Sequence, residues 1–564
     1  NDFGAVGDGN TDNTAAFQRA MDEAAKAGGG VVHVPAGHYR FNGVLSIPGA
    51  VTLQGTFRVP PTDQREARPK LDGSVLLAYA GRGNPDGEPF IRLAGSMATI
   101  SGFTIMYPEW NEETVPPVAY PPTIYANGVV NNGILDCLLL NSYEGIVLQD
   151  AARFLVRNVY GYPSKRGLYV DACYDIGRVE NCHFWPFGVV YHPDKPYSQW
   201  INLNGVAFEF ARTDWQYVIN TFCFGYGVGY KFSTSKNGSC NGNFVGIGAD
   251  CCVRSVLVDT APGTIDLLIT NGEFVGRWGS VDSVGVEIIN RSTGRVSFTN
   301  CAFWGPLDKC IWQRAPQGNV NATACGFLSW DEGAKDSPAV QIDGGKVTLQ
   351  GNSFERDGLN VVIGEKVDSA ILIGNQAWGG FQVDNHAGKR TQMVANEVNL
   401  LDWPRGSKRN YRVVVGLPGD SRFLKGFHGR EGGGFWGAEE TMRWGGANPR
   451  ILLPIEKNRT YTVKLDVFVN ENAVSPDAGV YLGDQKLADL PAVRGIAELV
   501  FTLPPQKNDM AELKIKAKSW RPCDVESSGD ARTLSVALHR IELTSGRKTT
   551  RVYNANSGEW VTPH

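Results

Sequence analysis

The spacing of apolar residues changes once near the start of the chain, from a helical period to a strand period. Apolar residues recur every three to four positions from Phe17 to Ala25, and Gly28-Gly29-Gly30 ends that pattern. From Val31 to Phe41 apolar and polar residues alternate, with one interruption at Pro35-Ala36-Gly37. These periods predict one short amphipathic helix followed by β-strands.

Further along, short units of the form apolar-x-apolar-Asn/Gly-x-x-Phe recur at intervals that fit one turn of three strands and three bends. Asparagine suits such a bend because it tolerates left-handed backbone geometry, and identical side chains one turn apart can form a hydrogen-bonded ladder. The predicted ladder residues are Asn158, Asn181, Asn220, Asn271 and Asn300. The pattern predicts stacked coils of parallel strands.

The N-terminal motif points to the same architecture. Asp2-Phe3-Gly4-Ala5-Val6-Gly7-Asp8-Gly9 and then Thr11-Asp12-Asn13-Thr14-Ala15-Ala16-Phe17-Gln18 resemble the entry signature of pectate-lyase-like β-helix proteins. That family includes glycoside hydrolases, polysaccharide lyases, alginate epimerases and phage tailspikes. The resemblance implies an all-β, right-handed parallel β-helix with a short N-terminal capping helix, in which these Asp residues are structural.

A second region follows where the Asn period stops. Residues 401–425 are rich in Pro, Gly and charge, which predicts a linker. Residues 426–564 contain strands that alternate in period 2 between turn residues, which predicts a β-sandwich. We therefore expect a catalytic β-helix over residues 1–400 and an accessory sandwich. Tryptophan is more often a core residue than a sugar-stacking one, so we expect Trp436, Trp444 and Trp520 in the core of the sandwich.

Composition narrows the possible partners. The 564 residues carry a formal net charge of -4, which offers no broad positive field for nucleic acid and no basic amphipathic stretch for a membrane surface. The sequence contains no run of 18 apolar residues, so no membrane-spanning helix is predicted. The chain opens inside its motif, so we expect a removed leader and a secreted, periplasmic or cell-surface location. Cys137, Cys182 and Cys301 precede apolar strand positions and are expected in the interior, and no Cys-x-x-Cys pair suggests a zinc or redox site.

Chemistry is expected where the outward side chains of successive coils form a column. We superimpose the strands Gly145–Asp150, Gly167–Asp171 and Gly188–Asp194, which places Gln149, Asp171 and His192 outward above one another. The next coil is irregular between Asp194 and Asn220 and clusters charged and aromatic residues. We expect Asp214 there, beside His192 and two coils from Asp171.

The first hypothesis is a glycoside hydrolase, because glycosidic cleavage usually needs two carboxyl groups. It assigns Asp171 and Asp214 as general acid and base, with Glu209 as a substitute for either. His192 and Arg212 would tune protonation or hold substrate, and the remaining predicted substrate-binding residues are Tyr169, Tyr191, Asp194, Trp200 and Trp215. The partner would be a carbohydrate polymer or oligosaccharide, with no cofactor.

Two alternatives stay open. A polysaccharide lyase or uronate epimerase would use a basic residue such as Arg212, Lys231 or Lys236 to remove the proton next to a uronate carboxylate, with calcium as a possible cofactor. A non-catalytic tailspike or adhesin would use the same coils for mechanical stability and sugar recognition. The sequence leaves the sugar, the linkage, the position of cleavage along a chain and the oligomeric state open.

Overall fold

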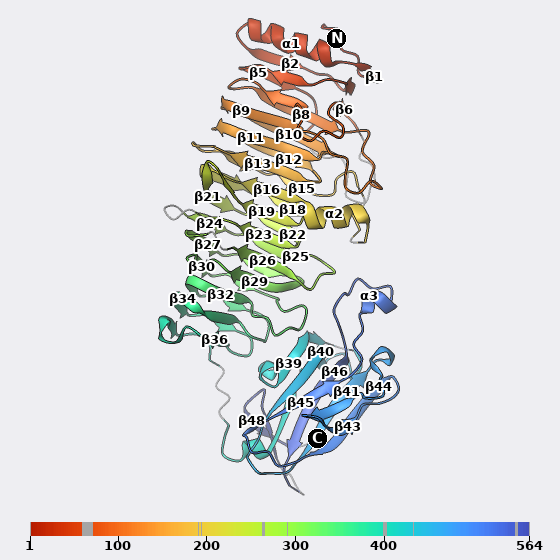
Figure 1. Ribbon diagram of the computed structural model, residues 1–564, viewed down its shortest axis with the longest axis vertical. Helices are drawn as coiled ribbons and strands as arrows, with labels where there is room; N and C mark the ends of the chain where they lie inside the picture. The colour runs from red at the N-terminus through yellow and green to blue at the C-terminus, as the bar shows by residue number, and fades with distance from the viewer. Residues whose placement is uncertain are drawn as a thin grey trace.

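A computed structural model describes residues 2–58, 71–189, 191–192, 194–261, 266–289, 292–398, 403–432, 434–546 and 551–562. Within these ranges the chain forms two regions, a stack of parallel coils and a smaller, mainly antiparallel β-structure below it (Figure 1). The helix α1 (Thr14–Lys26) covers the N-terminal end of the stack and buries Phe17 and Met21 against the first coils. The predicted all-β parallel β-helix with a capping helix is confirmed.

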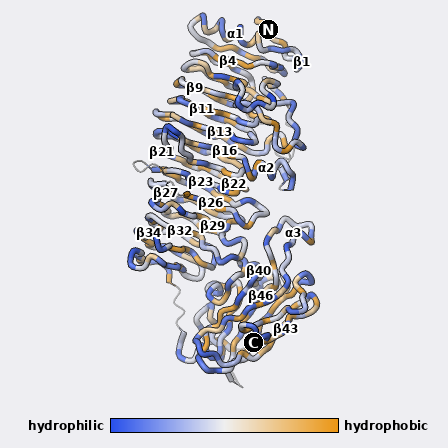
Figure 2. Tube along the Cα trace, viewed as in Figure 1, coloured by the Kyte–Doolittle hydropathy of each residue, from blue (hydrophilic) through white to orange (hydrophobic). Residues whose placement is uncertain are grey.

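Each coil of the stack contributes one short strand to each of three parallel sheets, which we call the first, second and third sheets. In one coil these strands are β24 (Leu267–Thr270), β25 (Glu273–Gly276) and β26 (Ser283–Ile288), and they pair in parallel with β27 (Arg295–Thr299), β28 (Ala302–Trp304) and β29 (Leu307–Gln313) of the next. Hydrophilic and hydrophobic segments both occur along the coils (Figure 2).

The remaining strands extend the three sheets. The first sheet also contains β2 (Gly30–His33), β5 (Val51–Gln54), β14 (Arg178–Glu180), β17 (Thr213–Ile219), β21 (Gly238–Val245), β30 (Asn319–Thr323) and β37 (Thr391–Val394). The second sheet also contains β1 (Asp8–Asp12), β3 (Gly37–Phe41), β6 (Ser74–Ala78), β15 (His183–Phe184), β18 (Phe222–Phe224), β22 (Gly248–Cys252), β31 (Gly326–Phe327), β33 (Ser353–Phe354) and β35 (Gln376–Ala377). The third sheet also contains β4 (Leu45–Ile47), β7 (Ile91–Leu93), β9 (Ile124–Val130), β11 (Glu144–Ala152), β13 (Arg166–Asp171), β16 (Val206–Phe210), β19 (Val228–Phe232), β23 (Arg254–Val258) and β36 (Val383–Asn385).

Some elements depart from this plan. Long strands bend from one sheet into the next: β8 (Thr99–Met106), β10 (Gly133–Leu140), β12 (Leu155–Gly161), β32 (Val340–Gln350) and β34 (Val361–Ile373). The strand β20 (Thr234–Ser235) forms a hairpin with β21, and the helix α2 (Pro196–Asn204) interrupts one coil between the second and third sheets. The 3-10 turn η1 (Gly388–Arg390) lies near the last coil.

The five predicted ladder residues lie at the bend between the first and second sheets, and hydrogen bonds join two pairs of them. All five predicted residues have a left-handed backbone, with φ between 52° and 55°. The Asn181 side chain donates to Asn158 at 2.8 Å, and Asn300 donates to Asn271 at 2.8 Å. Cys137, Cys182 and Cys301 are buried beside this bend, as expected.

The second region has its own core, and its strands form one hydrogen-bonded network in which β46 (Val536–Thr544) pairs with three other strands. Its other strands are β38 (Asn410–Val414), β39 (Leu424–Gly432), β40 (Thr441–Pro454), β41 (Tyr461–Val469), β42 (Gly479–Leu482), β43 (Gln485–Asp489), β44 (Gly495–Leu503), β45 (Met510–Lys516), β47 (Val552–Asn554) and β48 (Glu559–Val561). Short helical turns are η2 (Ser407–Arg409), η3 (Asp420–Arg422), η4 (Glu471–Ala473) and α3 (Pro522–Val525).

The expected linker of residues 401–425 needs a correction. The strand β38 pairs with β46 inside it, and η3 lies against the last coils, so the second region begins earlier than predicted. The Pro and Gly residues of this segment form tight turns between packed elements, which sequence composition does not distinguish from a linker. The predicted boundary between residues 400 and 401 lies outside the described residues.

Candidate functional site

The predicted catalytic cluster lies on the outer face of the third sheet, where charged side chains of opposite sign alternate. Tyr169 on β13 pairs with Glu209 on β16, and Glu209 pairs with Lys231 on β19. The Glu209 carboxylate lies 3.1 Å from Arg166 and 3.0 Å from Lys231, and Arg166 also lies 3.0 Å from Glu144. We call this set the ion-pair ladder.

Electrostatics keep the ladder carboxylate charged. Burial alone would raise the pKa of Glu209, but Lys231 and Arg166 outweigh it and hold the pKa below its usual value. Burial and the neighbouring Asp171 and Glu209 carboxyls raise the pKa of Tyr169 to about 12. Glu209 therefore suits a structural ion pair better than a proton donor.

Asp171 is tied down by the coil that follows it. Its carboxylate accepts hydrogen bonds from the Arg212 backbone N–H at 3.1 Å, the Ser235 hydroxyl at 2.7 Å and the Asn237 amide at 3.1 Å. The Asp171 side chain is buried. These bonds fix the hairpin of β20 and β21 against β13.

Asp214 lies on the coil next to Asp171, not two coils away as expected, because Cys173 pairs directly with Thr213. Both oxygens of Asp214 accept from Arg212, at 2.5 and 2.7 Å, and these hydrogen bonds lower its pKa. The structure thus brings Asp171, Arg212 and Asp214 together on one face. Their catalytic roles stay predictions.

The expected strand Gly188–Asp194 is wrong. The strand β16 takes the next position on β13, and residues 188, 189, 191, 192 and 194 form no strand before α2, whose first residue is Pro196. Residues 190 and 193 lie outside the described residues. The His192 and Asp194 side chains are exposed and 3.5 Å apart, away from the Asp171 column. A proline-initiated helix inside the coil has no counterpart in the strand repeat, so superposition misplaced this segment.

The predicted aromatic subsites are scattered over different faces. Tyr191 donates to Asn202 at 3.0 Å and packs on Phe224. Trp200 lies on α2, and Trp215 on the first sheet is 57% exposed. The sequence-predicted residues therefore do not enclose one common groove.

A groove is present at another place, where the second sheet meets the second region. Two cavities of about 470 and 700 Å³ meet there at Ser329, Glu332 and Arg532. One extends towards Trp378 and Arg430, and the other towards Trp278 and Pro306 of the coils above. We call these two cavities together the junction groove.

An outward column of side chains runs along the second sheet, and its members Leu328, Glu355 and Trp378 line the junction groove. In each coil, the residue directly after the inward-facing position points outward, and neighbouring coils align these residues one above another. From top to bottom this second-sheet column is Trp185, Phe224, Asp250, Val275, Trp304, Leu328, Glu355 and Trp378. Trp278, 47% exposed, projects beside it and donates to Asp250 at 3.3 Å.

Two carboxyl groups in the groove have pKa values shifted in opposite directions. Burial raises the pKa of Glu332 above its usual value, with Arg532 opposing the rise. For Asp530, burial also favours a rise, but hydrogen bonds from Arg532 at 2.7 to 3.1 Å outweigh it and lower the pKa. The environment thus pushes the pKa values of Glu332 and Asp530 apart, a pattern that occurs between the acid and the base of catalytic carboxyl pairs.

One arginine connects these groups across the two regions. The Arg532 guanidinium lies 4.0 Å from the Glu332 carboxyl of the coils and donates to Asp530 and, at 2.8 Å, to Glu431 of the second region. His428 adds a second connection, with its ring nitrogens 3.0 Å from the Glu332 carbonyl and 2.8 Å from the Thr533 carbonyl. Burial lowers the pKa of His428 to about 4, so its ring is neutral.

The far wall of the groove carries an exposed cation over an exposed ring. The Arg430 guanidinium lies 5.2 Å from the centre of the Trp378 ring, which is 39% exposed. Among the residues that the structure describes, Arg430 has no carboxylate within 4.0 Å. The pair offers a stacking surface together with a hydrogen-bond donor.

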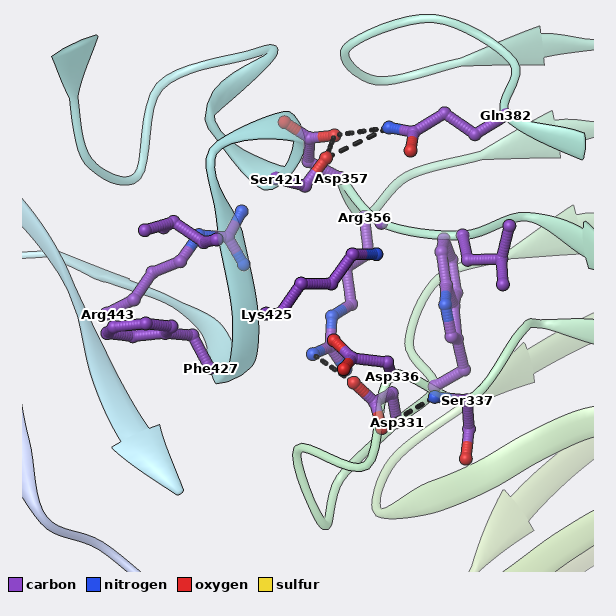
Figure 3. Close-up of a pocket in the computed structure, with 14 residues that line it drawn as sticks. Asp331, Asp336, Ser337, Arg356, Asp357, Gln382, Ser421, Lys425, Phe427 and Arg443 are labelled. Atoms are coloured by element: carbon purple, nitrogen blue, oxygen red, sulfur yellow. Dashed lines mark hydrogen bonds and ion pairs between the residues drawn. The ribbon is translucent and has the colours of Figure 1, made fainter. Parts of the chain in front are cut away.

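Behind the groove, a small polar cavity of about 30 Å³ marks where the two regions are fixed together (Figure 3). Asp357 of the last coils accepts hydrogen bonds from the Gly419 N–H at 2.6 Å and the Ser421 hydroxyl at 2.5 Å. Arg443 on β40 pairs through two hydrogen bonds with Asp420, which is fully buried. This docking holds Arg532 and Arg430 against the coils.

Sequence reasoning missed the groove, although part of its signal was present. Trp185, Trp304 and Glu355 directly follow the Phe of the repeat unit, so the repeat itself marked an outward column. Glu332 and Arg532 carried no such signal because the docking of two regions brings them together.

Within the described ranges, no three His, Cys, Asp or Glu side chains are arranged to hold a metal ion. Among the same residues, none of the helices is long and apolar enough to cross a membrane.

Comparison with known proteins supports the resemblance at the N-terminal end. Residues 1–103 match the family model described as "Rhamnogalacturonase A/epimerase, pectate lyase-like". Mannuronan C5-epimerase AlgE2 of Azotobacter vinelandii is 62% identical over 110 residues, which are 18% of this chain and 11% of that protein. The tail spike protein of Shigella phage Sf6 is 40% identical over 84 residues, 14% of this chain and 13% of that protein. The chain thus spans about a tenth of the length of these curated relatives.

Two solved structures align with this chain at low identity and low TM-score. The A-module of mannuronan C-5 epimerase AlgE6 of Azotobacter vinelandii aligns with a TM-score of 0.41 and 17% identity, over 70% of this chain and 97% of that chain. The tailspike protein of E. coli bacteriophage HK620 in complex with a pentasaccharide aligns with a TM-score of 0.43 and 10% identity, over 96% of this chain and 91% of that chain.

Proposed function

We propose that this protein is a carbohydrate-active enzyme that hydrolyses glycosidic bonds of a polysaccharide or oligosaccharide in the junction groove. The observation that carries the proposal is the opposite pKa shift of Glu332 and Asp530 on either side of Arg532. The exposed rings of Trp278 and Trp378 supply flat apolar surfaces of the kind on which sugar rings stack.

In this proposal Glu332 is the general acid. Burial raises its pKa and so favours the protonated form, which would donate to the glycosidic oxygen as the bond to the anomeric carbon breaks. Asp530 stays ionised and acts as the base that takes a proton from water, while the water oxygen bonds to the anomeric carbon. Arg532 is a positioning residue, because its two hydrogen bonds hold the Asp530 carboxylate and prevent it from competing for the Glu332 proton.

A second candidate is epimerisation or elimination at a uronic acid. The identity with proteins named mannuronan C5-epimerases favours it, and the match covers 18% of this chain. Arg430 could then bind the uronate carboxylate, and no calcium-type cluster accompanies it among the described residues. A glycan-binding role without catalysis is the third, favoured by the match to a tail spike protein.

Incubation with mannuronan, rhamnogalacturonan and neutral glycans separates the candidates. Hydrolysis releases reducing ends without an unsaturated product, lysis adds ultraviolet absorbance, and epimerisation changes the proton spectrum of the sugar without shortening the chain. We expect Glu332→Gln to abolish reducing-end release and Glu365→Gln, an exposed carboxylate on β34, to leave it unchanged. Unchanged activity of Glu332→Gln would refute the proposed site, and binding without any product would favour the third candidate. A location outside the cytoplasm fits such a substrate and stays a prediction.

A further inference from the structure

The proposed acid does not lie at an end of the second-sheet column. Glu332 follows Leu328 in the same coil, and its backbone N–H bonds to the Leu307 carbonyl of the preceding coil at 3.0 Å. Trp304 and the coils above it extend the column in one direction, and Glu355 and Trp378 extend it in the other. Neighbouring coils are about 4.8 Å apart, so the column from Asp250 to Trp378 extends roughly 24 Å.

The two cavities of the junction groove also lie on opposite sides of Glu332. The cavity of about 700 Å³ lies on the Trp278 side of Glu332, and the cavity of about 470 Å³ lies on the Trp378 side. Both include Glu332 and Arg532 in their walls. Room for ligand is therefore present on both sides of the reacting group.

The two sides also differ in what they present. On the Trp278 side, the ring is held by its hydrogen bond to Asp250 and lies 6.3 Å from the Trp304 ring. On the Trp378 side, the ring lies under the Arg430 guanidinium. Each side thus offers at least one exposed ring whose position is fixed by a neighbouring side chain. A sugar chain is held firmly across the reacting bond only when it is bound on both sides of that bond.

We propose that the groove takes an unbranched glycan chain laid along the axis of the coils, with sugar rings on Trp278 and Trp378 at once, and that cleavage falls inside the chain. This inference rests on the proposed function and adds the form of the substrate and the position of attack. A groove built for chain ends would place the acid beyond the last stacking ring. Here the rings flank it.

The test uses the full chain with mannuronan and rhamnogalacturonan, both as long polymers and as oligomers of graded length. Early in the reaction, size-exclusion chromatography should show a rapid fall in polymer length before small sugars accumulate. Oligomer affinity should rise with length until both tryptophans are covered. Trp278→Ala and Trp378→Ala should each weaken binding of long oligomers roughly tenfold, the equivalent of one stacked ring. Trp215→Ala, which removes an exposed ring from the first sheet, should not.

The outcomes separate the two proposals. Release of single sugars or dimers from a polymer that stays long, or equal affinity for short and long oligomers, would overturn the inference and leave hydrolysis in the groove standing. Loss of affinity on the Trp378 side alone would also overturn it. Absence of both binding and product with every probe would overturn the proposed function itself, and the inference with it.

Discussion

Docking of the second region depends on a carboxyl group that titrates near neutral pH. Asp357 is 3% exposed and accepts hydrogen bonds from Gly419 and Ser421, which belong to the start of the second region (Figure 3). Burial, and then the nearby Asp420 carboxylate, raises the pKa of Asp357 from 3.8 to about 6. The substitution Asp357→Asn removes this titration while keeping the shape of the side chain.

The size and sign of the effect follow from linkage. A rise of about two pKa units at about 1.4 kcal/mol each corresponds to about 3 kcal/mol of unfolding free energy. The folded state holds this proton up to about pH 6, whereas the unfolded chain releases it near pH 3.8. The contribution is therefore fully present below about pH 4 and is lost as the pH rises through about 6.

Urea unfolding of wild type and Asp357→Asn from pH 4 to pH 7, followed by tryptophan fluorescence, measures this contribution. The unfolding free energy of wild type minus that of the variant should fall by about 3 kcal/mol over this range. The exposed Asp384→Asn variant serves as the control and should follow wild type throughout. Parallel profiles for wild type and Asp357→Asn would refute the reasoning.

Three further predictions concern the groove, the asparagine ladder and the ion-pair ladder. Activity should fall as the pH rises through the elevated pKa of Glu332. Glu332→Gln should lower kcat roughly 10² to 10⁴-fold and remove this fall from the pH profile. If the variant keeps the fall, another group is responsible for it. Buried Asn375 belongs to a second asparagine ladder, in which Asn352 donates to Asn375 and Asn375 donates to Asn396 and to the Leu349 carbonyl. Asn375→Ala should cost about 1 to 3 kcal/mol of unfolding free energy, against almost none for a change at a surface asparagine. Equal costs would contradict a structural role for this second ladder. Glu209→Gln should lower the unfolding free energy by a similar amount at pH 7. Because the Glu209 pKa is lowered in the folded state, wild type should lose stability as the pH falls below about 4.5, and the variant should not show this loss. The same loss of stability in both proteins at acidic pH would contradict the ion-pair assignment.

The coil architecture was predictable because its signals are local. Asn158, Asn181 and Asn300 mark a left-handed bend wherever they occur, and stacking identical side chains follows from the repeat length alone. The capping helix was predictable for the same reason, because residues 14–26 carry their own period and their own glycine stop.

The candidate site was not predictable in the same way. The insertion of α2 into one coil moved His192 and Asp194 out of the third sheet, and a strand repeat gives no warning of such an insertion. Glu332 and Arg532 lie far apart in the chain and approach only because two regions dock. The cluster that the sequence singled out, around Asp171 and Glu209, is compact in space, and its carboxylates bind donors on neighbouring coils.

The most direct test of the groove is the crystal structure of Glu332→Gln soaked with an oligosaccharide that wild type degrades. We predict continuous sugar density along the second sheet, with rings over Trp278 and Trp378 and a glycosidic oxygen beside residue 332. Sugar density over Tyr169 and Glu209 on the third sheet, with the junction groove empty, would contradict the account.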